Sequence, residues 1–226
     1  MLHVGDTIDH YRVLAPVDRS DLTAVVRVEH AHLGTHHALK MQLDLTDPVV
    51  VRSMLHGARL QASLDHPHLV RCTDAGEHRE HPYMVTDWMA GGTLTDWLDR
   101  QGALPVHVAL ALFRGLSRGV RALHARRIVH RDLKPSNVLL HEDRDLRRRV
   151  PKITDLNLAK ILVEGELPTP TGISAEFRTL GTPEYMAPEQ AAIGGQDVDT
   201  RADVYSLGVL LYELLVGTAP FDRSRL

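Results

Sequence analysis

The first part of the chain alternates short apolar runs with polar breaks, a pattern typical of β-strands. Four runs rich in β-branched, aromatic or other apolar residues cover positions 11–14, 23–28, 36–41 and 83–86. Between the third and fourth runs, Asp47-Pro48 marks a helix start, because proline suits the first helical turn. Apolar residues then recur at helical spacing at Val51, Leu55, Ala58 and Ala62. The pattern predicts a strand-rich first part with one helix that ends near Pro67.

The second part of the chain has helical patterning and begins after the break at Ala90-Gly91-Gly92. A helix opens at Pro105, and its apolar side chains are expected on one face, at Val106, Leu110, Phe113, Leu116, Val120 and Leu123. A loop-rich stretch covers residues 128–200. The last helix, from Arg201 to Gly217, is apolar almost all round, which predicts burial on most sides. Strands followed by helices favour an α+β fold with two segregated lobes.

Length and composition limit the class of protein. The 226 residues contain no internal repeat and no linker, and 43% are hydrophobic and 24% charged, as in an ordinary globular domain. The net charge of −3 provides no general field for nucleic acid. No apolar run reaches membrane-spanning length, and the N-terminus does not resemble a signal peptide. The only cysteine, Cys72, indicates a reducing compartment, so a cytoplasmic location is expected.

The most specific chemical signal is the sequence His-Arg-Asp-Leu-Lys-Pro-Ser-Asn at residues 130–137. Phosphoryl transfer needs a carboxylate that accepts the proton of the attacking hydroxyl, and an amide oxygen that holds a magnesium ion. Asp132 and Asn137 supply these groups, and Lys134 can reach the transferred phosphate. The segment matches the catalytic loop of protein kinases at every fixed position.

On these residues the chain resembles the Hanks-type Ser/Thr protein kinases, most closely the bacterial ones, from about Tyr11 to Phe221. The resemblance implies one bilobal domain that binds ATP and Mg²⁺. A small β-rich N-lobe is expected over about 1–86, a hinge over 87–91, and a mostly helical C-lobe over 92–226. This C-lobe is expected to lack its last helices.

The resemblance also assigns a nucleotide site. Lys40, in Ala38-Leu39-Lys40, would contact the α and β phosphates, and Asp155 would join Asn137 as a magnesium ligand. Thr86 would be the gatekeeper residue that ends the strand before the hinge. The other residues expected around the nucleotide are Asp87 and Met89, through their backbones, with Val17, Val25, Ala38 and Leu139.

The segment from Gly181 to Glu189 resembles the end of a kinase activation segment. Thr182 together with Lys134 favours Ser/Thr over Tyr as the acceptor. Arg131 could bind a phosphate on the activation segment, and Asp203 would brace the catalytic loop. The candidate phosphorylation sites are Thr169, Thr171, Ser174 and Thr179, with a merely flexible polar loop as the alternative.

Two parts of the family pattern are absent from the N-lobe, and Leu156 and Asn157 stand where the segment after Asp155 should have phenylalanine and glycine. The loop that covers the phosphates should carry three glycines, whose bare backbone lies close to the phosphates, but their positions hold Asp18, Ser20 and Thr23. The helix glutamate that should pair with Lys40 falls on Gly57, and residues 48–64 contain no acidic residue. Gln61 could offer only a neutral hydrogen bond. We therefore expect Lys40 to pair with Asp155 or Asp18.

These observations leave two main functions open. The first is a Ser/Thr protein kinase of reduced activity, because Lys40, Asp132, Lys134, Asn137 and Asp155 are all present. The second is a pseudokinase that acts as a regulatory or scaffolding module. A small-molecule phosphotransferase is disfavoured by the activation-segment motif.

A protein substrate is expected, and a homodimer or partner would cover the incomplete C-lobe and its apolar last helix. Nucleic acid and a membrane span are not expected.

Overall fold

The computed structural model describes residues 2–46, 48–143, 148–156, 160–161, 183–191 and 198–221. The chain divides into two compact units. Unit 1 comprises Met1–Asp65 and Val70–Met89, and unit 2 comprises His66–Leu69 and Ala90–Leu226. The protein therefore combines a strand-rich unit with a mainly helical one, and the α+β assignment is confirmed.

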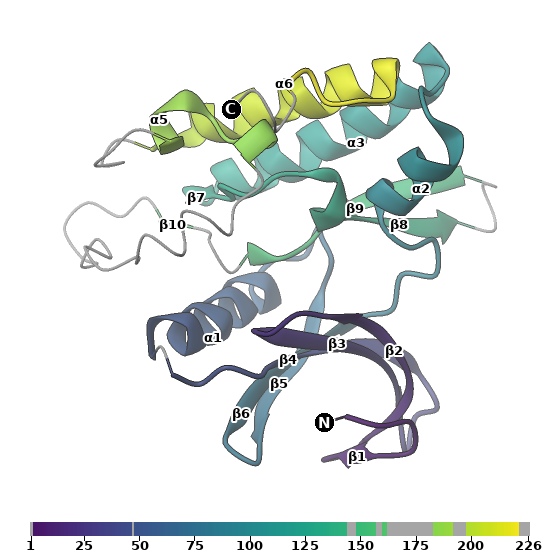
Figure 1. Ribbon diagram of the computed structural model, residues 1–226, viewed down its shortest axis with the longest axis vertical. Helices are drawn as coiled ribbons and strands as arrows, with labels where there is room; N and C mark the ends of the chain where they lie inside the picture. The colour runs from purple at the N-terminus through teal and green to yellow at the C-terminus, as the bar shows by residue number, and fades with distance from the viewer. Residues whose placement is uncertain are drawn as a thin grey trace. The chain divides into compact units, whose positions relative to one another are not determined.

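Unit 1 is a six-stranded antiparallel sheet with one helix (Figure 1). The strand order is β1-β2-β3-β4-β6-β5. The helix, α1 (Pro48–Ala62), packs against β5 and β6. The strands are β1 (Thr7–Ile8), β2 (Tyr11–Arg19), β3 (Thr23–His30), β4 (His36–Gln42), β5 (Cys72–His78) and β6 (His81–Asp87).

Successive side chains along each strand point to opposite faces of this sheet. One face carries the main core, with Leu39 and Met41 of β4 buried beside Val85 of β6. On the other face Met84 packs against Met54 and other residues of α1. Each strand therefore contributes alternate residues to the core and to the face that α1 covers.

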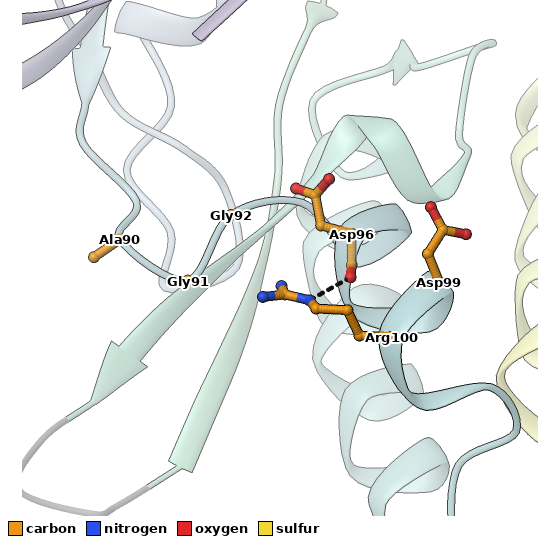
Figure 2. Close-up of a pocket in the computed structure, with 6 residues that line it drawn as sticks. All are labelled: Ala90, Gly91, Gly92, Asp96, Asp99 and Arg100. Atoms are coloured by element: carbon orange, nitrogen blue, oxygen red, sulfur yellow. Dashed lines mark hydrogen bonds between the residues drawn. The ribbon is translucent and has the colours of Figure 1, made fainter. Parts of the chain in front are cut away.

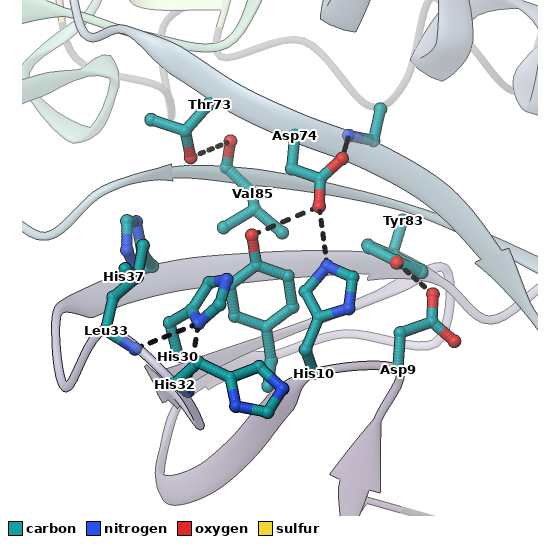
Figure 3. A network of polar contacts seen from close by, with 12 residues as sticks. Asp9, His10, His30, His32, Leu33, His37, Thr73, Asp74, Tyr83 and Val85 are labelled. Atoms are coloured by element: carbon teal, nitrogen blue, oxygen red, sulfur yellow. Dashed lines mark hydrogen bonds and ion pairs between the residues drawn. The ribbon is translucent and has the colours of Figure 1, made fainter.

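Polar contacts tie the first strands to β5 and β6 at one region of the sheet (Figure 3). The Tyr11 hydroxyl donates to Asp74 Oδ2 at 3.1 Å, and the Tyr83 hydroxyl donates to Asp9. Burial, with the nearby Asp74 carboxylate, raises the pKa of Tyr11 to about 12. The His37 ring lies 5.8 Å from the Tyr11 ring, edge to face. Burial lowers the pKa of His37, so unit 1 folds best around the neutral imidazole.

His37 should make the protein less stable in acid. In the unfolded chain its pKa returns to about 6.5, so the unfolded state takes up the proton first as the pH falls. The stabilisation from the neutral ring is complete above about pH 6.5 and declines below it. The replacement His37→Gln should flatten the dependence of the unfolding free energy on pH, measured by urea titration between about pH 7.5 and about pH 5.5. The replacement His107→Gln removes an exposed histidine and should leave that dependence unchanged; equal slopes in both variants would contradict this account.

Unit 2 is built around two long helices that lie side by side, α3 and α6 (Figure 1). The hairpin of β8 and β9 packs against α3 through β9. The helices are α2 (Leu94–Gln101), α3 (Val106–His124), α5 (Pro188–Ala191) and α6 (Thr200–Val216). The other elements are β7 (Ile128–Val129), η1 (Pro135–Asn137), β8 (Val138–Asp143), β9 (Arg148–Ile153), β10 (Lys160–Ile161) and η3 (Pro183–Tyr185). Among the described residues, no helix is both long and apolar enough to cross a membrane.

The buried face of α3 differs from the predicted one. Val106 and Leu110 were expected in the core but are 63% and 37% exposed. Gly115 and Gly119 lie on the buried face instead, beside Leu112, Leu116, Val120 and Leu123. A Cβ atom at Gly115 would come within 2.7 Å of Pro151 Cγ. The helix is thus turned so that its glycines allow β9 to approach closely, which counting apolar residues alone did not reveal.

The predicted last helix is confirmed as α6, and it ends at Gly217 in the left-handed conformation. Ala202, Leu207, Leu210 and Leu214 are among its buried residues. The prediction that α6 is buried on most sides is therefore only partly correct. Val204, Tyr212 and Val216 are 61%, 45% and 50% exposed. The helix therefore has one buried side and an exposed side that carries apolar residues.

Two glycine replacements should have opposite effects on stability. The replacement Gly115→Ala puts a methyl group against Pro151 and His68, and should lower the unfolding free energy by about 1–3 kcal/mol. The replacement Gly208→Ala, in α6, meets no atom within 4 Å and should raise it by up to about 1 kcal/mol through helix propensity. Urea denaturation of both variants measures the difference, and destabilisation of similar size in both would refute the packing argument.

Candidate active site

A buried carboxylate on α6 holds the start of the predicted catalytic loop. The Asp203 side chain is fully buried, and its two oxygens accept hydrogen bonds from the backbone amides of His130 and Arg131, each at 2.9 Å. His124, in the last turn of α3, approaches the same carboxylate through Nε2 at 2.7 Å. Arg131 has a φ of 71°, a conformation that costs free energy unless its surroundings fix it. The loop therefore takes its shape from α6, as the expected bracing role of Asp203 requires.

The Asp203 carboxylate stays ionised at neutral pH. Burial alone would raise its pKa, but the hydrogen bond from His124, the nearby His130 and the two backbone amides together outweigh burial, and the pKa lies below its usual value. A buried negative charge is tolerated only with such compensation. The charge consequently makes the attachment of the loop stronger than neutral hydrogen bonds would.

The three predicted catalytic residues are close together in the structure. Asn137 Nδ2 donates to the Asp132 carbonyl at 2.7 Å and to Asp132 Oδ2 at 2.8 Å. Lys134 Nζ lies 2.9 Å from the same Oδ2. Within the described part of the chain, both donors engage Oδ2, which leaves Oδ1 to accept a proton. The Asn137 amide nitrogen is also engaged, so the amide oxygen is the atom left to bind a metal ion.

The segment before Asp155 is bonded to this loop. His130 is fully buried, and its Nε2 is 3.0 Å from the Thr154 carbonyl oxygen. The Thr154 amide donates to the carbonyl of Asn137 at 3.0 Å. Asp155, the next residue, has a φ of 67°. The two expected magnesium ligands, Asn137 and Asp155, thus come from segments joined by hydrogen bonds around Thr154.

The described residues of the predicted activation segment, with α5 that follows them, are attached both to the loop and to α6. Gln190, in α5, donates from Nε2 to the Arg131 carbonyl at 2.8 Å. Tyr185 donates its hydroxyl to Glu213 Oε2 at 2.6 Å, and the Tyr185 carbonyl accepts a hydrogen bond from Ser206 at 2.8 Å. Burial raises the pKa of Tyr185 and that of Glu213.

A small cavity of about 10 Å³ is lined by Arg131, Asp132, Leu133, Tyr185 and Met186. Residues of η3 and its flank therefore lie beside the candidate catalytic carboxylate of Asp132.

Arg131 lies between these elements. Burial lowers the pKa of its guanidinium group, although Asp203 opposes this effect. Its Nε is buried and forms no hydrogen bond within the part of the chain that the structure describes. Glu189 lies half-buried in α5. The phosphate acceptors predicted for Arg131, namely Thr169, Thr171, Ser174 and Thr179, lie outside the described residues, as does Thr182.

A wider depression begins where unit 2 begins (Figure 2). It has a volume of about 550 Å³ and is lined by Ala90, Gly91, Gly92, Asp96, Asp99 and Arg100. The Gly91 amide donates to the Leu140 carbonyl at 3.1 Å, and a Cβ atom at Gly91 would come within 2.4 Å of that oxygen. Leu139, expected beside the nucleotide, bridges to Thr93 next to these glycines. The lack of a side chain at Gly91 therefore lets β8 pack closely against the segment that lines this depression.

Most of the nucleotide-binding residues predicted in unit 1 share one face of the sheet. Lys40 pairs with Val25, and Ala38 pairs with Thr86, so these four side chains lie on the face that α1 covers. Val17 lies in β2 and is 50% exposed. Asp87 ends β6, and Met89 follows and is buried. The expected pairing of Lys40 with Asp155 or Asp18 stays a prediction.

The turn that replaces the glycine-rich loop bonds to itself. Ser20 Oγ accepts hydrogen bonds from the amides of Leu22 and Thr23 at 3.3 and 3.1 Å, and the Ser20 amide donates to the Thr23 carbonyl at 2.9 Å. The amides that a glycine-rich loop would turn toward phosphates are thus engaged within the turn. On α1, Gln61 donates from Nε2 to the Val70 carbonyl at 2.9 Å, so it links α1 to the segment just before β5.

Four residues that hold the site together carry no recognisable motif in the sequence. His124, Thr154, Gln190 and Glu213 contact the catalytic loop or η3 from positions that no local motif marks. The only signal in the sequence is that each of these side chains is polar. Their neighbours are mostly apolar or, for Thr154, include a predicted site residue, Asp155. Asp203 was found because its position in the family pattern is known.

The fold and these contacts define a protein of the kinase class, and comparison with known proteins supports this. The family model described as protein kinase domain matches residues 18–225, so the chain belongs to that family. The predicted resemblance to bacterial Ser/Thr kinases is also confirmed. Serine/threonine-protein kinase pkn2 of Myxococcus xanthus is 36% identical over 219 residues, which are 94% of this chain and 25% of the relative. PknL of Mycobacterium tuberculosis is 39% identical over 164 residues, 73% of this chain and 38% of the relative.

A solved structure shares the fold. A double mutant of the PknI kinase domain of Mycobacterium tuberculosis superimposes with a TM-score of 0.77 at 26% identity, and the match covers 100% of this chain and 80% of that one. The kinase-like fold predicted from the motifs is therefore confirmed. The chain spans about a quarter to two fifths of the length of the two curated relatives named above.

Removing the charge of Asp203 should loosen the catalytic loop. The replacement Asp203→Asn keeps the shape of the side chain but loses one acceptor and the compensated charge, so the unfolding free energy should fall by about 2–4 kcal/mol. Hydrogen exchange of the His130 and Arg131 amides should become faster. The control Asp199→Asn makes the same change at the N-cap of the same helix, where Asn caps as well as Asp, and should change little. Unaltered exchange at both amides in Asp203→Asn would show that the carboxylate does not hold the loop.

Proposed function

We propose that this chain transfers the γ-phosphate of ATP to the hydroxyl of a serine or threonine in a protein. The observation that carries the proposal is the arrangement at Asp132. Asn137 and Lys134 both hold Oδ2 of its carboxylate, which leaves Oδ1 for the proton of the acceptor hydroxyl. This is the arrangement that phosphoryl transfer needs, because positioning and charge provide most of the catalysis.

The residues in the loop suit Mg²⁺ and ATP. Magnesium prefers oxygen ligands, and the Asn137 amide oxygen and the Asp155 carboxylate are of that kind. When bound, Mg²⁺ would neutralise charge on the phosphates. Lys134 would balance negative charge on the transferred phosphoryl group while it orients Asp132. In unit 1, Lys40 would contact the α and β phosphates, with Val25, Ala38 and Thr86 on the same face beside the base.

We expect this activity to be reduced, and the binding-module alternative rests on a specific observation. The Ser20 turn satisfies its own amides, so few backbone donors remain there for phosphates. Hydrogen bonds to charged groups contribute about 1.5–3 kcal/mol each, so the loss of two would weaken nucleotide binding by orders of magnitude. α1 also has no acidic residue among its positions. A pseudokinase would keep the fold without using the loop.

The setting of the protein is part of this proposal. A lone, buried Cys72 supports a reducing location such as the cytoplasm. The motif at Gly181–Glu189 and the contacts of Tyr185 support a protein as the phosphate acceptor. The exposed Val204, Tyr212 and Val216 on α6 support a homodimer or a partner that covers this side.

The test compares the chain with the variant Asp132→Asn. Incorporation of labelled phosphate into a mixed Ser/Thr protein substrate, with Mg-ATP, should fall by about a hundredfold or more in the variant, because the proton acceptor is lost. The variant Glu77→Gln makes the same change of charge at an exposed position of β5 and should retain activity. Equal background signals from the folded wild type and Asp132→Asn would reject the enzyme. In that case a thermal shift with Mg-ATP tells whether the pseudokinase alternative includes nucleotide binding.

A further inference from the structure

The exposed face of α3 carries only positive charge. Arg114, Arg118 and Arg121 follow one another at spacings of four and three residues, so they lie on the same face of the helix, and all three are exposed. From Arg114 to Arg121 they span about 10 Å along the helix axis. The helix contains no aspartate or glutamate. We call these three arginines, with Lys152 and His66, the α3 basic face.

Residues outside the helix extend this face. β9, which contains Lys152, packs against α3. Burial lowers the pKa of His66, and the positive groups of His68, Lys152, Arg121 and Arg118 lower it further. Burial is the larger cause, and the smaller electrostatic part places His66 among basic groups. All of them belong to unit 2, so the face is a property of that unit alone.

The three arginines have no partner in the part of the chain that the structure describes. Their side chains form no hydrogen bond or ion pair there, unlike several other arginines. Arg12 pairs with Glu29, and Arg201 pairs with Asp199. Arg149 lies near Glu142 and over the Trp97 ring. Like charges four residues apart destabilise a helix, so the stripe costs stability unless something negative binds it.

We propose that the α3 basic face docks an acidic segment of a partner protein, one rich in aspartate and glutamate. The guanidinium group matches the geometry of a carboxylate and can bind it through two hydrogen bonds. Three arginines over two helical turns fit carboxylates spaced along a short segment. The chain as a whole has a net charge of −3, which would repel a long polyanion such as DNA, whereas a short acidic segment contacts only the positive face. This docking does not require ATP or Asp132, so it stands independently of the proposed function.

Fluorescence anisotropy with the full chain tests the proposal. The probe is a labelled peptide of about fifteen residues with glutamates spaced three and four apart in an alanine background, and its counterpart carries glutamine. We expect the glutamate peptide to bind at low salt and to weaken as salt rises. The triple variant Arg114→Gln, Arg118→Gln and Arg121→Gln should bind it about tenfold more weakly. The matched variant Arg52→Gln, Arg59→Gln and Arg79→Gln loses three exposed arginines elsewhere and should bind within about twofold of wild type.

Reversing the charge gives a second readout that does not depend on lost binding. The variant Arg114→Glu, Arg118→Glu and Arg121→Glu should lose the glutamate peptide and gain a lysine peptide of the same spacing. Circular dichroism confirms that each variant is folded. No binding of the glutamate peptide to wild type, or an equal loss in the two glutamine variants, would overturn the proposal. Tighter binding of a DNA duplex or of phosphatidylserine vesicles than of the peptide would overturn the choice of a protein partner.

Discussion

The ionised carboxylate of Asp203, buried in α6, is the interaction on which the candidate site depends. A charge without water around it is stable only if donors replace the water, and here His124 and the amides of His130 and Arg131 do so. The same contacts hold Arg131 in its left-handed conformation, from which the chain turns toward Asp132. Because Ser206 and Glu213 of the same helix hold Tyr185, α6 positions both the catalytic loop and the segment beside it.

The two units differ in how far they keep the family's chemistry. The groups that would move a proton and hold a metal ion, Asp132, Asn137 and Asp155, all belong to unit 2, where hydrogen bonds link their segments. The departures, at the Ser20 turn and at Gly57 of α1, belong to unit 1, which would contact the nucleotide. Under the proposed function, the departures in unit 1 would weaken nucleotide binding more than the phosphoryl-transfer step. Because unit 2 keeps the groups for phosphoryl transfer and unit 1 carries the departures, the same sequence supports both a weak kinase and a pseudokinase.

Local patterns predicted the elements well, and contacts distant in sequence explain what they did not predict. The strands β2, β3, β4 and β6 and the helices α1 and α6 follow from the sequence pattern, whereas β1 and β5 were not among the four predicted runs. Asp132 and Asn137 stay together because one short turn joins them. The helix α2 was not predicted, although Thr93 and Asp96 form a capping box at its start. His124 reaches Asp203 across 79 positions and Gln190 reaches Arg131 across 59, and no window of sequence contains such pairs.

The two faces of α3 show why its arginines call for an explanation outside the fold. On the inner face Gly115 and Gly119 let β9 and the segment before β5 approach closely, and no arginine takes part in these contacts. Long arginine stems can cover apolar surface, but these three side chains are exposed, and the core residues of α3 lie on the opposite face. Their mutual repulsion lowers the stability of the helix instead of adding to it. A role in binding a negatively charged segment accounts for their number, spacing and exposure together.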